Sequence, residues 1–540
     1  MALFEVTDLA VTLHSGTRAT GRRAVRAVES FSFSVDDGQT LAIVGESGSG
    51  KSVSLLAATS LLGPGADVSG TVRFRDRDLL ASSPGELRRI LGKDIGFVFQ
   101  DPQSNLHPFK TVGSQIDEVL HIHGFGDRRA RRHRVTDLLD EVGIADPHNA
   151  YDSYPAEFSG GMRQRVMIAM AVALNPALII ADEPTTALDV SVQAGILRLL
   201  TRLQREHGTA IVFVSHDLGV VHQIADTVAV VRDGRVVEQG PRDRIYHSPH
   251  EDYTRQLLAA SRLRDVSDVP CRAPVQAEPL LQVTGLRKSY RGRAGQARRT
   301  VIDGLDFAIA RGEIVALVGE SGSGKSTVGR IVAGLQFADA GEIVLAGTRY
   351  PTAVADGVPA LSPASRRAVQ LVFQDPYSSL NPSRTVSQTL AEPLLAQKVN
   401  RAEIASKVAA AADAARLPGA LLNRRPVELS GGQRQRVAIA RALVLSPQLI
   451  VADEALSSLD VTTQAEIIDL IGRLTTEQHT AFLFITHDLG VVSSLARSVI
   501  VLGPDGVEET GDTADVFTEP RSAYTRALLD AVPRADARAS

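Results

Sequence analysis

A glycine-rich octapeptide that occurs twice has the clearest chemistry in the sequence. The spelling Gly-Glu-Ser-Gly-Ser-Gly-Lys-Ser spans Gly45–Ser52 and returns at Gly319–Ser326. Glycines let backbone N–H groups close around an anion, and the start of a helix adds a favourable dipole. The lysine ammonium neutralises phosphate charge and the serine hydroxyl is a ligand for Mg²⁺. An ordinary glycine-rich turn would not return with identical spelling, so the sequence predicts two phosphate-binding loops.

A pair of acidic residues follows a later apolar run in each half of the chain. The pair is Asp182-Glu183 in the first half and Asp453-Glu454 in the second. An aspartate at the end of a buried strand is placed to hold Mg²⁺, directly or through water. The neighbouring glutamate is placed to orient or deprotonate an attacking water molecule. Such a pair alone also fits a polar strand end, but its position after a phosphate loop favours the catalytic interpretation.

The elements that position these residues follow from the pattern of apolar runs. Runs such as Thr40–Val44 and Ala177–Ala181 end at the phosphate loop and at the acidic pair, and helical stretches such as Val53–Thr59 lie between them. This alternation predicts an α/β fold with a mainly parallel sheet. The Arg-rich stretches Glu86–Lys93 and Arg128–Arg134 are interpreted as parts of a mostly helical insert, although their single charges also fit solvated helical faces.

Composition excludes several classes of protein. The 540 residues carry a formal net charge of -4, whereas nucleic-acid-binding proteins usually show a basic surface. With Cys271 as its one cysteine, the chain forms no internal disulfide, which favours a reducing cytosol. The first residues lack the pattern of a secretory signal, and no stretch reaches the ~20 apolar residues that span a bilayer.

A third repeated motif identifies the family that the chain resembles. Phe158–Met162 and Leu429–Gln433 are similar to the signature of the ATP-binding cassette family, and the resemblance covers both halves almost end to end. A serine and two glycines at a helix start offer a hydroxyl and open N–H groups to a γ-phosphate. An ordinary Ser-Gly-Gly helix cap is the alternative, but Arg163-Gln-Arg165 and Arg434-Gln-Arg436 follow in the two copies.

The resemblance implies a fold and domain boundaries. We expect two tandem phosphate-loop (RecA-like) ATPase cassettes, each with an antiparallel β subdomain and a helical subdomain. The first cassette would span residues 1–260, a Pro-, Asp-, Arg- and Ala-rich linker residues 261–278, and the second cassette residues 279–540. Each half ends alike, at Tyr253–Leu258 and Tyr524–Leu529, and we expect each ending to be an amphipathic helix that packs on its own domain.

Further motifs match the family and complete two predicted sites that bind ATP and Mg²⁺. Gln100 and Gln374 resemble the glutamine loop, and Asp189 and Asp460 resemble the loop that communicates across the dimer. The catalytic residues implied by the resemblance are Glu183 and Glu454 with the switch histidines His216 and His487. The implied Mg²⁺ ligands are Ser52, Gln100, Asp182, Ser326, Gln374 and Asp453. The implied nucleotide contacts are Gly45, Ser47, Gly48, Gly50, Lys51, Ser52, Val53, Gln100, Ser159, Gly160, Gly161, Tyr290, Gly319, Ser321, Gly322, Gly324, Lys325, Ser326, Thr327, Gln374, Ser430, Gly431, Gly432 and Gln433.

The resemblance also implies how the two halves work together. Two cassettes would sandwich two nucleotides head to tail, so that Lys51 works with Ser430 and Lys325 with Ser159. Because both halves lie on one chain, no homodimer is required.

The two predicted sites differ in sequence. Tyr290 stands where the family stacks an aromatic ring on adenine, and the matching residue is Leu13; such stacking contributes about 1 kcal/mol or more. Met162 replaces the usual signature glutamine, and Ala455-Leu456 replaces Pro184-Thr185. Both glutamates remain, so we expect two hydrolysis-competent sites.

Subfamily features indicate an importer. The stretches Phe99–Pro108 and Phe373–Pro382 resemble those of oligopeptide, dipeptide and nickel importers. We therefore expect the ATP-hydrolysing motor of a bacterial importer for peptides or peptide-like solutes, with nickel or another small solute left open. The implied partners are two integral-membrane permease subunits, docked on the Arg-rich inserts near Gln100–Pro108 and Gln374–Pro382, and an extracytoplasmic solute-binding protein. The implied location is peripheral, on the cytoplasmic face of the inner or plasma membrane, without nucleic acid.

Two other functions known for tandem cassette ATPases are alternatives to the importer. Soluble members that act on ribosomes usually have a long basic helical linker, whereas this linker is short and mixed in charge. Chromosome-structuring ATPases need a long coiled coil, and no sustained heptads occur in the sequence. Many importer ATPases of this subfamily carry a cysteine-rich tail that binds an iron–sulfur cluster, but with Cys271 alone no cluster is expected.

Overall fold

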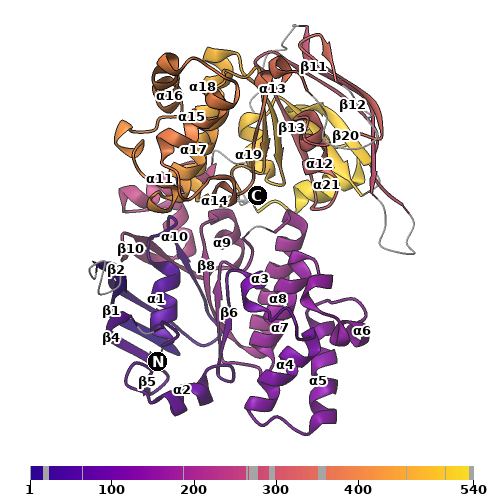
Figure 1. Cartoon of the computed structure of the whole chain (residues 1–540). Coiled ribbons are helices and arrows are strands. Elements are labelled where there is room, and N and C mark those ends of the chain that lie inside the picture. The colour runs from indigo at the N-terminus through magenta and orange to yellow at the C-terminus, as the bar shows by residue number, and fades with distance from the viewer. Residues whose placement is uncertain are drawn as a thin grey trace. The chain divides into compact units, whose positions relative to one another are not determined.

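The computed structural model of the chain divides into two compact units. Unit 1 is built on Met1–Arg262 and unit 2 on Leu263–Val532, and each is described by itself (Figure 1). The structure describes residues 2–15, 23–63, 65–186, 188–262, 266, 278–290, 298–350, 361–457, 459–504 and 506–533. Most of the predicted linker 261–278 therefore lies outside the described residues.

One ten-stranded sheet runs through unit 1 in the order β5-β4-β1-β2-β10-β9-β3-β8-β7-β6. Strands β9, β3, β8, β7 and β6 are parallel, and their apolar residues are buried on both faces. The remaining neighbours pair antiparallel, apart from the parallel bridge between β2 and β10. The strands are β1 (Phe4–Ser15), β2 (Arg23–Val35), β3 (Thr40–Val44), β4 (Ala66–Phe74), β5 (Arg77–Asp78), β6 (Ile95–Val98), β7 (Leu178–Asp182), β8 (Ala210–Ser215), β9 (Thr227–Arg232) and β10 (Arg235–Pro241).

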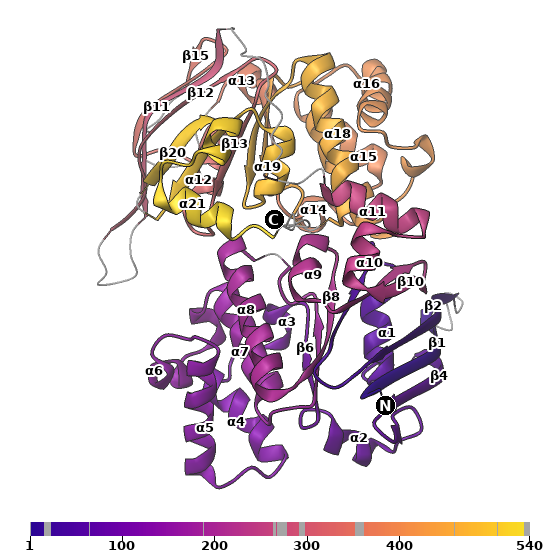
Figure 2. The same ribbon diagram turned by 180° about the vertical axis from the view of Figure 1, so that it is seen from behind.

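Two groups of helices complete unit 1. Helices α4 to α7 share a hydrophobic core with one face of strands β6, β7 and β8, and they gather beyond β6, at the end of the sheet opposite β1 and β4 (Figures 1 and 2). The helices are α1 (Lys51–Ala58), α2 (Pro84–Ile90), α3 (Pro102–Asn105), α4 (Val112–Ile122), α5 (Arg128–Glu141), α6 (Pro147–Asp152), α7 (Gly160–Val172), α8 (Val190–His207), α9 (Leu218–Ile224), α10 (Arg242–His247) and α11 (Asp252–Arg262).

The predicted helical insert is right for one Arg-rich stretch and wrong for the other. Arg128–Arg134 begins α5, inside the helical group. Glu86–Lys93 covers most of α2, but α2 belongs to the core of the sheet rather than to the helical group. The reason is the apolar spacing of Leu87 and Ile90, which turn inward onto that core while the arginines face outward.

Unit 2 repeats this architecture with two sheets. A four-stranded antiparallel sheet has the order β12-β11-β14-β15, and a six-stranded sheet has the order β16-β17-β18-β13-β19-β20, parallel except for β20. Its strands are β11 (Pro279–Tyr290), β12 (Arg299–Ala310), β13 (Ile314–Gly319), β14 (Ala340–Leu345), β15 (Thr348–Arg349), β16 (Val369–Val372), β17 (Leu449–Asp453), β18 (Ala481–Thr486), β19 (Ser498–Gly503) and β20 (Gly506–Asp512). Its helices are α12 (Lys325–Val332), α13 (Pro363–Ala368), α14 (Pro376–Ser379), α15 (Val386–Ala396), α16 (Arg401–Ala414), α17 (Gly431–Leu443), α18 (Val461–Gln478), α19 (Leu489–Leu495), α20 (Thr513–Thr518) and α21 (Ala523–Asp530). The predicted α/β fold with antiparallel and helical subdomains is confirmed.

The endings of the two halves form helices that pack as expected. Leu257 and Leu258 of α11 are buried in a cluster with Val44 of β3, and Leu528 and Leu529 of α21 are buried in the core of unit 2. Across the described ranges, every helix falls short of the length and apolarity needed to cross a bilayer.

Candidate nucleotide-binding sites

Two glycines of each phosphate loop are required by the backbone. Gly45 and Gly50 have φ of 157° and 96°. A Cβ on Gly45 would lie 2.2 Å from the carbonyl oxygen of Val231, and one on Gly50 would lie 2.7 Å from that of Ala27. The glycines therefore let the loop pass close to neighbouring backbone in a conformation suited to binding an anion.

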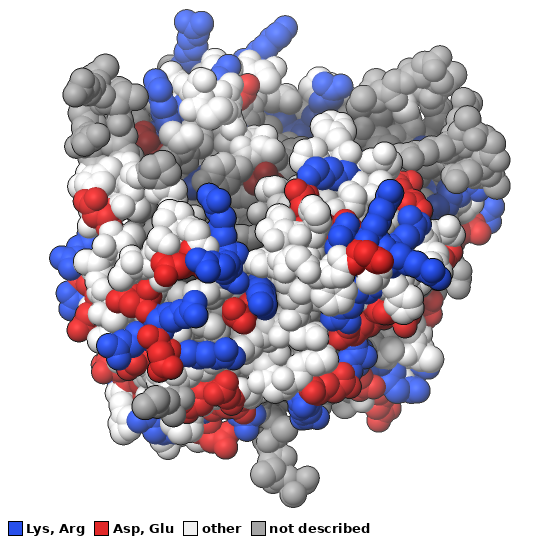
Figure 3. Space-filling model, turned by 90° about the horizontal axis from the view of Figure 1, so that it is seen from below, with Lys and Arg blue, Asp and Glu red and all other residues white. Residues whose placement is uncertain are grey.

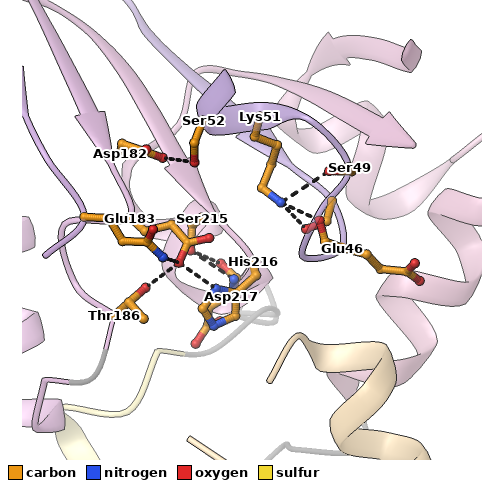
Figure 4. A network of polar contacts seen from close by, with 12 residues as sticks. Glu46, Ser49, Lys51, Ser52, Asp182, Glu183, Thr186, Ser215, His216 and Asp217 are labelled. Atoms are coloured by element: carbon orange, nitrogen blue, oxygen red, sulfur yellow. Dashed lines mark hydrogen bonds and ion pairs between the residues drawn. The ribbon is translucent and has the colours of Figure 1, made fainter. Parts of the chain in front are cut away.

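The loop lysine lies inside this cradle. Lys51 is the first residue of α1 and is only 4% exposed. Its Nζ donates to the carbonyl oxygens of Gly45 at 2.8 Å and Glu46 at 2.7 Å (Figure 4). Lys325 makes the same contacts with Gly319 at 2.7 Å and Glu320 at 2.8 Å. Each ammonium is thus held at the mouth of the loop, where a phosphate would meet it.

A serine and an aspartate form the polar pair beside each lysine. Ser52 Oγ donates to Asp182 Oδ1 at 3.0 Å, and Ser326 Oγ donates to Asp453 Oδ1 at 2.9 Å. Burial raises the pKa of Asp182 to about 6, against the opposing effect of the Ser52 hydroxyl, and burial also raises the pKa of Asp453. A hydroxyl and a carboxylate are the oxygen ligands that Mg²⁺ prefers, so these residues fit the predicted ion.

The predicted catalytic residues of unit 1 meet at one carboxylate. Parallel strands β3, β7 and β8 end at the same edge of the sheet, which brings Glu183 and His216 beside the phosphate loop. Glu183 Oε2 lies 3.4 Å from His216 Nδ1 and accepts from Gln100 Nε2 at 3.0 Å and Thr186 Oγ1 at 2.9 Å. The dashed lines of Figure 4 show the histidine and threonine contacts.

The electrostatics of this cluster bear on its chemistry. Burial raises the pKa of Glu183, but the hydrogen bond and charge of His216, together with Lys51 and Thr186, outweigh it and lower the pKa to about 2. Burial lowers the pKa of His216, but the hydrogen bond and negative charge of Glu183 outweigh burial. The net shift of the His216 pKa is therefore upward. A carboxylate held this firmly in its ionised form is suited to orienting a water molecule and is a weak proton acceptor.

Unit 2 builds the same cluster with one difference. Glu454 Oε2 accepts from Gln374 Nε2 at 2.6 Å, and Glu454 Oε1 lies 3.6 Å from His487 Nδ1. Ser457, the counterpart of Thr186, donates to the backbone oxygen of Glu454 at 3.0 Å instead of to its carboxylate. The sequence prediction did not include Thr186. The sequence difference after the two glutamates, Pro-Thr-Thr against Ala-Leu-Ser, was the feature that could have indicated it.

Backbone conformation is a second feature that the motifs did not reveal. Glu183 and Glu454 have φ of 46° and 47°, in the left-handed region that residues other than glycine rarely adopt. Their N–H groups donate to the carbonyl oxygens of Val214 at 3.1 Å and Ile485 at 2.9 Å. Strained conformations of this kind persist at functional sites because the surrounding structure holds them.

The signature residues start α7 and α17, whereas the loop lysines start the separate helices α1 and α12 (Figure 1). Ser159 Oγ accepts from the N–H of Met162, and Ser430 Oγ accepts from that of Gln433, each at 3.3 Å. Gln433 also accepts from the N–H of Ser430, which completes a capping box that Met162 cannot form. Both serines therefore cap their helices, which is compatible with either interpretation of the motif, and their contact with a nucleotide stays a prediction.

The adenine-side residues differ between the units. Tyr290 Oη lies 3.1 Å from Thr327 Oγ1 and accepts from Gln336 Nε2 at 2.7 Å. The matching Leu13 and Val53 both pack against the apolar core of unit 1. A polar pair in unit 2 is thus replaced by an apolar pair in unit 1, and stacking of adenine on Tyr290 stays a prediction.

The fold and these clusters define each unit as a phosphate-loop nucleotide-binding domain. A family model described as ABC transporter matches residues 28–186 and 302–457, more than half of the chain. The chain therefore belongs to the ABC transporter family. A second model, described as the C-terminal region of oligopeptide/dipeptide transporters, matches residues 508–540.

Curated relatives match over almost the whole length. The chain is 43% identical to the glutathione import ATP-binding protein GsiA of Pectobacterium atrosepticum, over 94% of this chain and 87% of that protein. It is 41% identical to the peptidoglycan transport ATP-binding protein YejF of Agrobacterium fabrum, over 98% of this chain and 96% of that protein. Among solved structures, the dimeric cassette MJ0796 bound to ADP and Pi is 30% identical, covers 44% of this chain and 98% of its own, and has a TM-score of 0.39.

Proposed function

We propose that this chain is the ATP-hydrolysing motor subunit of a bacterial importer for peptides or peptide-like solutes. The observation that carries the catalytic part is the meeting of Gln100, Glu183 and His216 at the sheet edge that also holds Lys51 and Ser52. The match of residues 508–540 to oligopeptide/dipeptide transporters supports the cargo class, as do the glutathione and peptidoglycan transport functions for which the relatives are named.

The chain's own residues divide the work at each proposed site. Lys51 and the N–H groups of its loop would bind the phosphates, and Ser52 and Asp182 would hold Mg²⁺, which supplies charge neutralisation. Glu183, fixed by its three partners, would orient the attacking water. The equivalent residues of unit 2 would act alike, and the predicted pairing of Lys51 with Ser430 and of Lys325 with Ser159 is part of the proposal.

Two exposed apolar side chains support docking of permease subunits beside the glutamine loops. Phe109, which follows the predicted docking stretch Gln100–Pro108, is 84% exposed. Tyr377, within the predicted stretch Gln374–Pro382, is 63% exposed, and the guanidinium of Arg434 lies over its ring. Aromatic residues are enriched in protein–protein interfaces relative to the rest of the surface. A peripheral position on the cytoplasmic membrane face and an extracytoplasmic solute-binding protein complete the proposed complex.

The Arg-rich start of α5 is less suited to docking. Arg131 pairs with Asp117 at 2.9 Å, and Arg132 pairs with Asp152 at 3.1 Å. On the face shown in Figure 3, Lys and Arg side chains are interspersed with Asp and Glu side chains. A mixed surface of this kind is typical of solvated faces.

Uptake in proteoliposomes tests the proposal. The full chain is reconstituted with its two permease subunits, and uptake of labelled peptides is measured with ATP inside and the binding protein outside. We expect uptake to need ATP and to be lost in the double variant Lys51→Ala and Lys325→Ala. Recovery of the chain with ribosomes and without membrane subunits would overturn the importer proposal.

A further inference from the structure

The terminal helix of each unit touches the phosphate loop through a tyrosine. Tyr253 Oη of α11 accepts a hydrogen bond from the backbone N–H of Glu46 at 3.2 Å. Tyr524 Oη of α21 accepts one from the N–H of Glu320 at 3.3 Å. Glu46 and Glu320 are the second residues of the two octapeptides, so the contact occurs at the same place in both halves.

Tyr253 is buried beside the phosphate loop of unit 1. Tyr253 is 6% exposed and lies in a buried cluster with Val44, the residue that precedes the loop. The guanidinium of Arg232 lies over its ring, 4.9 Å from the centroid. Tyr524 is partly buried and packs against the core of unit 2. These contacts hold each hydroxyl in place, which lowers the entropy cost of its hydrogen bond.

A glutamate on the preceding strand anchors each terminal helix. Glu238 of β10 accepts from the N–H of His250 at 2.9 Å and from that of Glu251 at 3.2 Å, just before α11 begins. Glu509 of β20 accepts from the N–H of Arg521 at 2.9 Å and from that of Ser522 at 3.1 Å. Both units therefore have the same two connections, from the strand glutamate to the start of the terminal helix and from the tyrosine of that helix to the phosphate loop.

The residue held by the tyrosine is also held by the loop lysine. In unit 1 the N–H of Glu46 is bound by Tyr253 while its carbonyl oxygen is bound by Lys51. A phosphate would draw the ammonium towards itself, but the tyrosine contact lies on the N–H side and does not have to break. The N–H of Ser49 also donates to the carbonyl oxygen of Glu46, at 3.2 Å. The tyrosine hydroxyl therefore adds a second contact that holds Glu46 in place when the lysine turns to a ligand.

We propose that Tyr253 and Tyr524 are positioning residues for nucleotide binding, through which the terminal helices set the affinity of the phosphate loops. The inference rests on the proposed role of those loops in binding phosphate. It gives the C-terminal region that matches oligopeptide/dipeptide transporters a role in nucleotide binding within its own unit.

The test measures binding of MgATP to the full chain at one site at a time. In a Lys325→Ala background, Tyr253→Phe keeps the ring and leaves the N–H of Glu46 without its partner hydroxyl. We expect MgATP affinity to fall about fivefold, which corresponds to one lost hydrogen bond of about 1 kcal/mol. In steady-state assays of the chain without the background change, KM should rise while kcat stays near that of the parent.

Tyr246→Phe is the matched control. Tyr246 belongs to the same buried cluster, but its hydroxyl donates to the carbonyl oxygen of Leu218 and not to the loop. Its counterpart in unit 2 is Phe517, so that half already lacks this hydroxyl. We expect Tyr246→Phe to leave MgATP affinity unchanged, while both variants shift the unfolding temperature by similar amounts.

The outcomes distinguish the positioning role of the tyrosines from the proposed role of the loops in binding phosphate. Unchanged affinity in Tyr253→Phe, or an equal loss in Tyr246→Phe, would overturn the positioning role. Full MgATP binding by the double variant Lys51→Ala and Lys325→Ala would instead overturn the phosphate loops as the binding sites. The reciprocal experiment places Tyr524→Phe in a Lys51→Ala background and should give the same loss.

Discussion

At the scale of single residues, the catalytic carboxylates are defined by what surrounds them. Glu183 and Glu454 each adopt a left-handed backbone and each meet a glutamine amide and a histidine ring. Because both clusters contain the glutamate with its glutamine and histidine partners, we infer that both hydrolyse ATP.

Substituting the glutamates tests that inference. Glu183→Gln and Glu454→Gln should each lower steady-state ATPase activity, and the double variant should lose turnover by about 100-fold or more, because an amide is a poor substitute for the carboxylate that orients water. MgATP binding should persist in all three variants. If one single change abolished all turnover and the other left it intact, the second site would be regulatory.

Thr186 gives a further prediction at this scale. In a Glu454→Gln background, Thr186→Val should lower kcat by about tenfold, because a hydrogen bond to a charged group is worth roughly 1.5 kcal/mol or more. Ser457→Ala in a Glu183→Gln background should leave kcat within twofold of its parent, since that hydroxyl binds only backbone. Equal losses in the two experiments would contradict a specific role for Thr186.

The sequence predicts such residues only when the motif is local. Lys51 and Ser52 follow from one octapeptide, and Asp182 and Glu183 from one strand end. The hydroxyl of Thr186 depends on a side-chain rotamer, and that of Tyr253 reaches a loop about 200 positions earlier in the chain. Neither contact is encoded in residue spacing, which is why only the structure revealed them.

At the scale of elements, buried strands are the most predictable part of the fold. The apolar runs at Thr40–Val44 and Ala177–Ala181 become β3 and β7 with little change, because strands buried on both faces are continuously apolar. The assignment of α2 to the helical insert is wrong because periodicity shows that a helix has an apolar face, but not which of two cores that face meets.

The glutamate anchor of α11 makes stability depend on pH. Burial raises the pKa of Glu238, but the hydrogen bonds from the N–H groups of His250 and Glu251 outweigh burial and lower the pKa. A lowered folded-state pKa contributes stability at neutral pH, and this contribution is lost as pH falls through that pKa. Glu238→Gln should therefore lower the free energy of unfolding by about 1 kcal/mol at pH 7.

Thermal unfolding of the variant and the parent across pH checks this prediction. The difference in unfolding temperature should shrink as the solution is acidified, because protonation of Glu238 in the parent removes the same charge. A constant difference across the range would show that the carboxylate charge does not anchor α11.

At the scale of the whole molecule, two cassettes on one chain predict a simple dilution behaviour. If each proposed site draws its signature from the other cassette of the same chain, the partners stay at a fixed effective concentration. Specific ATPase activity should then stay constant on about 100-fold dilution. A steep fall on dilution would show that two chains must meet, and would contradict the expectation that no homodimer is required.

The reach of each terminal helix to a phosphate loop changes where a minimal cassette ends. The ABC transporter match stops at Thr186 in the first half and at Ser457 in the second. The switch histidines lie beyond these points, and the tyrosines that hold Glu46 and Glu320 lie further on, close to the end of each unit. A truncated or chimeric cassette can keep every recognised motif and still lose its terminal helix. The phosphate loop of such a cassette would lack the hydrogen bond from its glutamate N–H to the tyrosine hydroxyl.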